Sequence, residues 1–333
     1  MNDALVTVLM PVYNACDYVA ASINSVISQE FEDWHLLVIN DGSTDNTAEV
    51  LEQFKDHPQI TIQTNPKNLK LIATLNSGIE LITSPYIARL DADDIMRPNR
   101  LYEQTKFMEA NKKVMLCGMG FYSFSEKGDY RTETLYPSSQ EEIIFRHLVN
   151  ISLCHGTIIM RNKIADQLIF NDDYPHAEDY ELFEKISAVY KVTNLNIIGT
   201  SVRIHEESVS HVFKETQLTG KKRVQSRAWS RLNMIATRKN VLHIEALLNQ
   251  QYNKIDLSYL EELLESMLNK KAIQSIPSIT WNGWCCLIGG YWYHACRNQS
   301  DFRTYALSSL SKHHRITLSE KLTFILKSFL YKS

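Results

Sequence analysis

The chain has 333 residues, more than one hydrophobic core usually supports, so two domains are expected. Its 44% hydrophobic and 22% charged residues are typical of a folded protein, and a net charge of −3 argues against a dedicated nucleic-acid-binding protein. No apolar run reaches the roughly 18 residues of a membrane-spanning helix. No signal peptide is evident, and the six cysteines form no CxxC pair or zinc-like spacing. A cytoplasmic protein with reduced thiols is expected.

Strand-like and helix-like segments alternate over the first 110 residues, which predicts a mostly parallel sheet flanked by helices. Apolar and β-branched runs indicate strands at 5–11, 36–39, 59–63 and 86–90. Helical spacing indicates helices at 18–29, 72–81 and 100–109, and another that Ser43 or Asp45 caps and that ends at Phe54. With further strands at 114–124 and 156–160, residues 5 to about 210 are interpreted as one α/β domain.

The remainder, residues 213–333, has few strand signals and carries helical patterns. A leucine stripe between Leu257 and Leu268 has glutamates on the opposite side. The aromatic segment 281–296 predicts two buried helices that meet near Gly289 and Gly290. Residues 311–333 have the pattern of a basic amphipathic helix. Two alternatives stay open for that helix, docking on its own domain or peripheral contact with the inner face of an anionic membrane.

Two acidic clusters, fifty residues apart, each follow directly on a short apolar run. Asp41 follows the strand at 36–39, and Asp91, Asp93 and Asp94 follow the strand at 86–90. The carboxyl ends of parallel strands form the edge where open α/β folds bind ligands, so the two clusters are expected at one site. Three crowded carboxylates repel one another unless a cation neutralises them. Oxygen ligands without thiols suit Mg²⁺ or Mn²⁺ shared with the phosphates of a substrate.

The end of the first strand adds an aromatic side chain to this edge. Tyr13 follows Pro11 and could stack on a flat base, or it could cap the core. Asp41, at the end of the neighbouring strand, could accept the N3–H of uracil, a donor that cytosine lacks. Gly42 then permits close approach of the backbone.

Three motifs in this order and spacing resemble those of family-2 glycosyltransferases with the GT-A fold. They are Val-Leu-Met-Pro-Val-Tyr-Asn at 8–14, Asn-Asp-Gly-Ser-Thr-Asp at 40–45 and Leu-Asp-Ala-Asp-Asp at 90–94. The resemblance implies a GT-A catalytic domain at 1–212, with a donor half at about 1–110 and an acceptor half at about 111–212. A helical C-terminal domain at 213–333 is expected to follow.

The helix before the acidic strand departs from the family pattern. Residues 72–79 resemble the family's helix, but Leu75 stands where many members have an arginine. Arg89 is a candidate electrostatic substitute for that arginine, with a purely structural ion pair as the alternative.

The resemblance also implies the residues of the donor site. Asp93 is expected to be the main metal ligand, Asp91 to contact the ribose or the metal through water, and His205 to place an imidazole at the metal. Asp94 would brace the loop or contact the sugar. The segment 201–210 resembles the mobile segment that closes over the donor diphosphate. The expected nucleotide-sugar contacts are Pro11, Tyr13, Asn14, Asp41, Asn68, Asp91, Ala92, Asp93 and Arg203.

Transfer with inversion requires a carboxylate near the acceptor hydroxyl. The segment His-Ala-Glu-Asp-Tyr-Glu-Leu-Phe at 176–183 resembles the family's Glu-Asp motif at the start of a helix. The resemblance implies that Asp179 is the catalytic base and that Glu178 orients it or binds acceptor. Ordinary helix capping is the alternative. His155 is a candidate acceptor ligand, with a core histidine as the alternative.

The implied activity is Mn²⁺- or Mg²⁺-dependent inverting transfer of one sugar from a UDP-sugar to a glycan hydroxyl, which forms a β-linkage. The expected acceptor is a repeat unit of a bacterial O-antigen or capsule on an undecaprenyl carrier. Residues 9–22 lack the GxGxxG turn of a dehydrogenase. No glycine-rich loop of a nucleotidyltransferase follows the first strand, and Gln225 to Trp229 has the wrong order for a processive synthase. A catalytically inactive sugar-nucleotide-binding or scaffold protein is the alternative, and homo-oligomer formation stays open.

Overall fold

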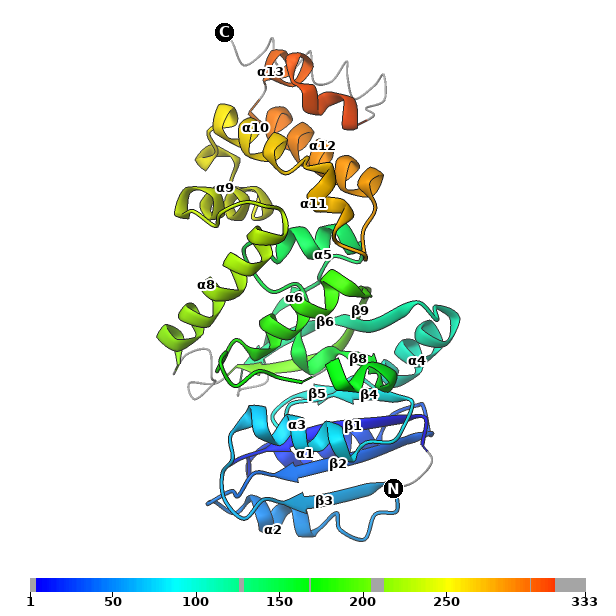
Figure 1. Cartoon of the computed structure of the whole chain (residues 1–333). Helices are drawn as coiled ribbons and strands as arrows, with labels where there is room; N and C mark the ends of the chain where they lie inside the picture. Colours follow the sequence, from blue (N-terminus) through cyan, green and yellow to red (C-terminus); the bar gives the residue numbers. More distant parts are fainter. Residues whose placement is uncertain (1–3, 126–128, 168, 205–212, 300, 315–333) are drawn as a thin grey trace. The chain divides into compact units, whose positions relative to one another are not determined.

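The structure is a computed structural model that describes residues 4–125, 129–167, 169–204, 213–299 and 301–314 (Figure 1). The chain separates into two compact units. Unit 1 comprises Met1–Ser139 and Ile151–Lys222, and unit 2 comprises Gln140–Asn150 and Arg223–Ser333. The short segment Gln140–Asn150, from within the expected catalytic domain, thus belongs to unit 2. The domain boundary at residue 212 itself stays a prediction.

Unit 1 is built, in its described part, on a nine-stranded sheet in the order β3-β2-β1-β4-β8-β6-β9-β5, with β7 paired to β6. β1 is parallel to β2 and β4, and β2 is parallel to β3, whereas β8 is antiparallel to β4 and β6. This mixed sheet confirms the predicted α/β fold class. The strands are β1 Val6–Val12, β2 Trp34–Asn40, β3 Ile60–Thr64, β4 Tyr86–Arg89, β5 Ile95–Met96, β6 Val114–Ser125, β7 Tyr130–Thr134, β8 Ile159–Arg161 and β9 Lys191–Ile204.

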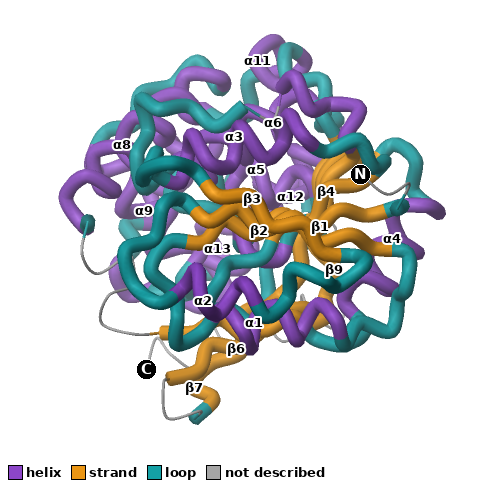
Figure 2. The backbone as a smooth tube through the Cα atoms, turned by 90° about the horizontal axis from the view of Figure 1, so that it is seen from below, coloured by secondary structure: helices purple, strands orange, loops and turns teal. Residues whose placement is uncertain are grey.

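Helices cover both faces of the parallel part of this sheet. Figure 2 shows α1 and α2 on one face of β1–β3 and α3 on the other. Strand residues point alternately to the two faces. Val8 accordingly shares a core cluster with Val19 of α1, and Leu9 meets Gly78 of α3, where an added Cβ would lie 2.5 Å from Leu9 Cδ1. The helices of unit 1 are α1 Val19–Ile27, α2 Thr47–Glu52, α3 Leu71–Leu81, α4 Arg100–Ala110 and α6 Glu178–Val189, with 3₁₀ turns η1 His155–Thr157 and η2 Asn162–Gln167.

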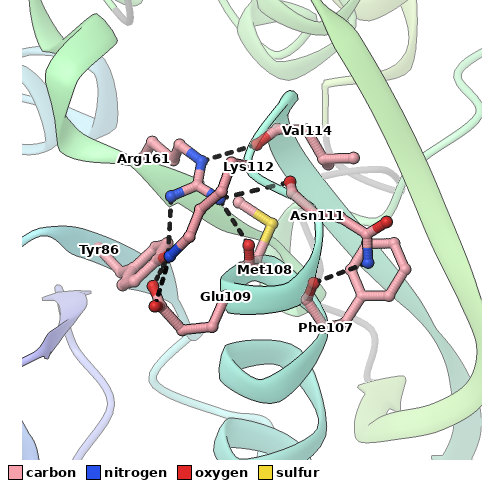
Figure 3. A network of polar contacts seen from close by, with 8 residues as sticks. All are labelled: Tyr86, Phe107, Met108, Glu109, Asn111, Lys112, Val114 and Arg161. Carbon is pink, nitrogen blue, oxygen red and sulfur yellow. Dashed lines mark hydrogen bonds and ion pairs between the residues drawn. The ribbon is translucent and has the colours of Figure 1, made fainter.

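A buried arginine fixes the amino end of β4 (Figure 3). Arg161 of β8 donates from Nε to the carbonyl oxygen of Val114 at 2.8 Å, from Nη1 to the Tyr86 hydroxyl at 2.8 Å and from Nη2 to the carbonyl oxygen of Met108 at 2.6 Å. Burial and a hydrogen bond to Glu109 raise the pKa of Tyr86 to about 12. Each guanidinium nitrogen of Arg161 therefore has an acceptor, and β4 is tied to α4 and β6 at this end.

Unit 2 is helical over its described residues, and its core contains the buried side chains of Trp229, Trp284 and Trp292. Trp229 donates from Nε1 to the carbonyl oxygen of Leu148 at 2.8 Å, and Trp284 donates to that of Met267 at 3.0 Å. The predicted leucine stripe lies on α10 and contributes to this core. The helices are α5 Gln140–Arg146, α9 Arg238–Leu248, α10 Leu257–Ser266, α11 Lys270–Gln274, α12 Trp281–Asn298 and α13 Phe302–Leu307, with η3 Tyr252–Lys254 and η4 Ser309–His313, while α8 Lys214–Arg231 runs from unit 1 into unit 2.

Two predicted elements were wrong in part. α12 runs without a break through the glycines that were expected to separate two helices. An added Cβ at Gly289 would lie 2.8 Å from the backbone carbonyl carbon of His313, so this glycine permits close packing rather than a helix end. The strand expected from Gly156 begins at Ile159, because the preceding residues form η1.

β9 has no counterpart among the predicted strands, and it includes the first four residues of the expected mobile segment 201–210. The rest of that segment, and the C-terminal residues 315–333, lie outside the described part of the chain. Within the described part, no helix has both the length and the apolar character needed to cross a membrane. The six cysteines are free thiols.

Candidate active site

The acidic loop that follows β4, Asp91–Asp94, is anchored to α1 by two serine hydroxyls. Ser22 donates its hydroxyl to the carbonyl oxygen of Ala92 at 2.7 Å. Ser25, one turn further along the helix, accepts the backbone N–H of Met96 at 3.0 Å. Helix α1 therefore fixes the loop on the side of the sheet edge where β1 ends.

Arg203, at the end of β9, holds the same loop from another side. Its backbone N–H donates to Asp94 Oδ1 at 2.9 Å, and its Nε donates to the carbonyl oxygen of Asp93 at 3.0 Å. The guanidinium lies between the rings of Tyr18 and Phe124, 4.7 and 4.5 Å from their centroids. These contacts hold the Arg203 side chain against the acidic loop. Asp94 thus braces the loop through its contact with β9.

A third support comes from η1. An added Cβ at Gly156 would lie 3.0 Å from Asp91 Oδ2 and 3.0 Å from Asp94 Oδ2, so both carboxylates lie against this glycine. The buried Arg100 donates to the carbonyl oxygens of Gly156 at 2.7 Å and Arg89 at 2.8 Å. The sequence analysis did not identify Arg100, which joins the end of β4 to η1.

The acidic loop places three carboxylates within four positions. Asp91 Oδ1 pairs with Arg89 Nη2 at 2.7 Å, and its side chain is 39% exposed. Burial opposes ionisation of Asp91, but the Arg89 guanidinium prevails and lowers its pKa. Burial and the charges of Asp93 and Asp91 raise the pKa of Asp94 well above its ordinary value. A bound cation would offset this repulsion between the carboxylates.

The donor set fits a hard divalent cation such as Mn²⁺ or Mg²⁺, because it consists of carboxylates alone. In the described part of the chain, no three histidine, cysteine, aspartate or glutamate side chains form a complete metal site. Mg²⁺ commonly takes only one or two protein carboxylates and fills its other positions with water and ligand oxygens. Asp91 and Asp93 meet that requirement. His205, the third predicted ligand, lies outside the described residues.

Asp41, at the end of β2, is 3% exposed and binds a loop of its own chain. Its Oδ1 accepts from Asn65 Nδ2 and from the backbone N–H of Leu69, both at 2.8 Å, and its Oδ2 accepts from the N–H of Lys70 at 2.9 Å. An ionised carboxylate has about four acceptor positions, so one stays available for a ligand. Lys70 has φ 76° and ψ 159°, a conformation that few residues other than glycine adopt.

The loops after β1 and β2 are hydrogen-bonded to each other and expose one aromatic ring. Asn14, at φ 48°, accepts from the N–H of Thr44 at 2.8 Å and donates its own N–H to Ser43 Oγ at 3.0 Å. Tyr13 is 44% exposed beside them. Asn68 Oδ1 accepts from the N–H of Lys70 at 2.9 Å. The structure places these predicted donor contacts, with the buried Pro11, where β1 and β2 end.

The predicted base lies at the start of α6. Burial raises the pKa of Asp179 to about 6, although the N–H of Tyr180 donates to its Oδ1 at 2.6 Å, and the charge of Asp91 adds to the rise. Burial and the charge of Asp179 raise the pKa of Glu178 to about 7. The buried Oε2 of Glu178 has no hydrogen-bond partner. The acidic loop and the start of α6 are therefore electrostatically coupled.

His155 of η1 is packed near two aromatic rings and stays neutral. Its ring centroid lies 5.3 Å from that of Phe170 and 6.1 Å from that of Phe183. Burial and the charge of Arg89 lower the pKa of His155 to about 3. Its buried Nε2 has no hydrogen-bond partner. A neutral imidazole with a vacant nitrogen can donate to or accept from a hydroxyl group, depending on its tautomer.

Comparisons with known proteins agree with this arrangement. The family described as Glycosyl transferase family 2 matches residues 7–170. An uncharacterized glycosyltransferase of Haemophilus influenzae is 33% identical over 83% of this chain and 90% of its own length. The UDP-Glc:alpha-D-GlcNAc-diphosphoundecaprenol beta-1,3-glucosyltransferase WfgD of Escherichia coli is 29% identical over 65% of this chain and 83% of its own length. S. aureus TarS 1-349 in complex with UDP-GlcNAc is 15% identical with a TM-score of 0.54, over 90% of this chain and 89% of that one.

The chain belongs to glycosyltransferase family 2. It is a glycosyltransferase with the GT-A fold, which confirms the resemblance, the fold class and the enzyme class predicted from the motifs. The roles of the individual site residues stay predictions.

Proposed function

We propose that the chain transfers one sugar from a UDP-sugar to a hydroxyl group of a lipid-linked glycan, with inversion and formation of a β-linkage. One observation carries this proposal. The acidic loop is held beside Arg89, and the charge of its Asp91 adds to the raised pKa of Asp179 on α6, where burial and Asp179 also raise the pKa of Glu178. When neighbouring acids have different pKa values, the acid with the lower pKa can bind a cation and the acid with the higher pKa can accept a proton. The name of the relative WfgD, with UDP-Glc and a diphosphoundecaprenol acceptor, supports the same chemistry.

On the donor side, Asp93 and Asp91 would hold a Mn²⁺ or Mg²⁺ ion, which when bound neutralises the charge of the departing diphosphate. The exposed ring of Tyr13 would stack on the uracil base. Asp41 would accept the N3–H of uracil at the acceptor position that its own loop leaves available. Backbone and side-chain groups of Pro11, Asn14, Asn68 and Ala92 would complete the nucleotide contacts.

On the acceptor side, Asp179 would accept the proton of the attacking hydroxyl while its oxygen bonds to the anomeric carbon. The bond between that carbon and the diphosphate breaks on the opposite face and its electrons leave with UDP, so the anomeric configuration inverts. A base with a pKa of about 6 is ionised at neutral pH and still accepts a proton readily. Glu178 and His155 would bind acceptor hydroxyls with their vacant atoms.

The proposed role of Arg203 differs from the nucleotide contact that was expected from the sequence. Because its Nε donates to Asp93 and its guanidinium packs between two rings, it would act first by holding the acidic loop. Any contact with the diphosphate would come from its remaining nitrogens. Contact with a membrane would follow from the lipid carrier of the acceptor, and we expect the C-terminal segment to contribute.

A panel of nucleotide sugars tests this function. The purified chain is incubated with UDP-, GDP- and dTDP-sugars in Mn²⁺, with and without EDTA, and with a synthetic sugar-diphospho-lipid acceptor. We expect one UDP-sugar to be consumed in the presence of metal and the product to show a β-linkage by NMR. Preference for another nucleotide, an α-linked product or metal-independent turnover would contradict the proposal. Tight UDP-sugar binding without turnover would favour the scaffold alternative.

A further inference from the structure

Three arginines are buried among the described residues, and Arg89 differs from the other two. Arg100 and Arg161 each donate from all three guanidinium nitrogens to acceptors in the protein. Arg89 donates from Nη1 to the carbonyl oxygen of Leu90 and from Nη2 to Asp91. Its buried Nε has no partner. A buried donor without a partner destabilises a fold, so an apolar side chain would suit this position better if packing were its task.

The charge of Arg89 acts on acids from two separate elements. It forms the ion pair with Asp91 in the loop after β4, with 2.7 Å between Nη2 and Oδ1. It also favours the ionised forms of Glu178 and Asp179 at the start of α6. In the proposed function these are the donor side and the acceptor side of one site.

The helix that precedes β4 offers no such charge. α3, Leu71–Leu81, contains neither arginine nor lysine, and Leu75 is fully buried in it. An arginine suits the end of β4 better than a lysine, because its planar fork donates to Leu90 and Asp91 at the same time.

We propose that Arg89 is a positioning residue for sugar transfer, which fixes the carboxylate of Asp91 and holds a permanent positive charge, buried with an unpartnered Nε, beside the acidic loop. The inference rests on the proposed function. It predicts that loss of the charge disturbs Asp91 and removes one of the charges that favour the ionised forms of the acids on α6. Turnover should therefore suffer more than nucleotide binding.

The first experiment compares Arg89→Met and Arg89→Lys with a matched control, Arg161→Met, which removes a buried arginine from the other end of β4. For each variant we measure kcat and KM for hydrolysis of the preferred UDP-sugar, the Kd for UDP with Mn²⁺ by calorimetry, and the urea midpoint. We expect Arg89→Met to lower kcat roughly 100-fold and to weaken UDP binding less than tenfold. Arg89→Lys should recover at least tenfold of the loss in kcat. Arg161→Met should lower the urea midpoint and keep kcat.

Two outcomes of this comparison would overturn the proposal. One is Arg89→Met with a kcat within threefold of wild type. The other is a loss of activity in Arg89→Met that is fully explained by its unfolded fraction, together with no recovery of kcat in Arg89→Lys. Either result would make Arg89 a structural residue like Arg161.

A second measurement needs no turnover. The Glu178 carboxyl, whose charged neighbours include Asp179 and Arg89, is titrated by ¹³C NMR and assigned with Glu178→Gln. We expect its titration to move to higher pH in Arg89→Met and to stay unchanged in Arg161→Met. If wild type consumes no UDP-sugar, the proposed function fails, and this titration still tests the charge of Arg89. An unchanged Glu178 titration in Arg89→Met would refute the role of that charge.

Discussion

Buried arginines with opposite surroundings lie at the two ends of β4, Arg161 of β8 beside its amino end and Arg89 at its carboxyl end. At the amino end, Arg161 donates to backbone carbonyls and a phenol, and each of its nitrogens has an acceptor. At the carboxyl end, Arg89 lies beside carboxylates and keeps a nitrogen without a partner. A fully satisfied buried network makes a fold rigid, whereas unbalanced groups are retained where a ligand uses them. We therefore expect the contacts at the amino end of β4 to serve stability and those at its carboxyl end to serve the proposed binding and catalysis.

Asp179→Asn should give the largest effect, a loss of activity without a comparable loss of UDP affinity. The amide cannot accept the proton of the acceptor hydroxyl, so we expect kcat to fall by roughly 10²–10⁴-fold while UDP affinity stays within twofold. Steady-state transfer assays and calorimetry measure the two quantities. Asp172→Asn, at an exposed acid before α6, is the control and should keep its kcat. Near-normal turnover in Asp179→Asn would remove this residue from the mechanism.

Arg161→Met should give the complementary result at the amino edge. The substitution removes the Arg161 donors from the carbonyl oxygens of Val114 and Met108 and from the Tyr86 hydroxyl, so we expect the free energy of unfolding to fall by about 3 kcal/mol. Urea unfolding followed by fluorescence measures this loss, and assays of the folded fraction measure kcat. If Arg161→Met had normal stability and a reduced kcat, the inference that this end of β4 serves stability would be wrong.

Glu178→Gln should stabilise the protein at high pH. The folded-state pKa of Glu178 is raised from 4.5 to about 7 by burial and by Asp179, so folding keeps a proton that the unfolded chain has lost. The native protein then loses stability as the pH rises from about 4.5 through 7, and glutamine avoids this loss. We expect the variant to gain about 2 kcal/mol at pH 8 and less at pH 5. Urea midpoints at both pH values test this, and an equal gain at both would contradict it.

Lys70→Gly should give the smallest effect. Glycine adopts the φ of 76° and ψ of 159° without strain, and we expect a gain of about 1 kcal/mol after its larger entropy loss on folding. The backbone N–H that donates to Asp41 is kept. Lys67→Gly, on the same loop, is the control and should not gain stability, because Lys67 is not among the residues with positive φ. Thermal unfolding of the two variants decides between strain and loop entropy.

The sequence alone was sufficient for the carboxyl edge, because its signals are local. Each acidic cluster follows its strand directly, so strand direction alone places Asp41 and Asp91 at one edge. The acids on α6 were placed at a helix start by the resemblance of residues 176–183 to the family motif. The pattern of apolar residues likewise predicted β1, α1, β2 and α3 to within a few residues.

Contacts between distant segments could not be predicted in this way. Arg100 acts on the site through Gly156, 56 residues away, and no local pattern distinguishes it from a surface arginine. Arg203 was expected at the nucleotide, but its contact with Asp94, 109 residues away, was not predicted. Gly289 was interpreted as a helix break. A glycine is needed there because the backbone of His313, in another segment, packs close against it. Asp41 was expected to accept a hydrogen bond from the uracil base. In the structure it already accepts three hydrogen bonds from a loop of its own chain.

The contact between Asp94 and Arg203 has a consequence for the order in which the site is completed during synthesis. Asp94 precedes its partner by 109 residues, and β5, which follows the acidic loop, pairs with β9. Such distant pairings form slowly because a long loop must close first. A nascent chain that ends before β9 therefore contains every acid of the loop without the strand that fixes it. We therefore expect the contact of the acidic loop with Arg203 to form late in the folding of unit 1, after its contact with α1.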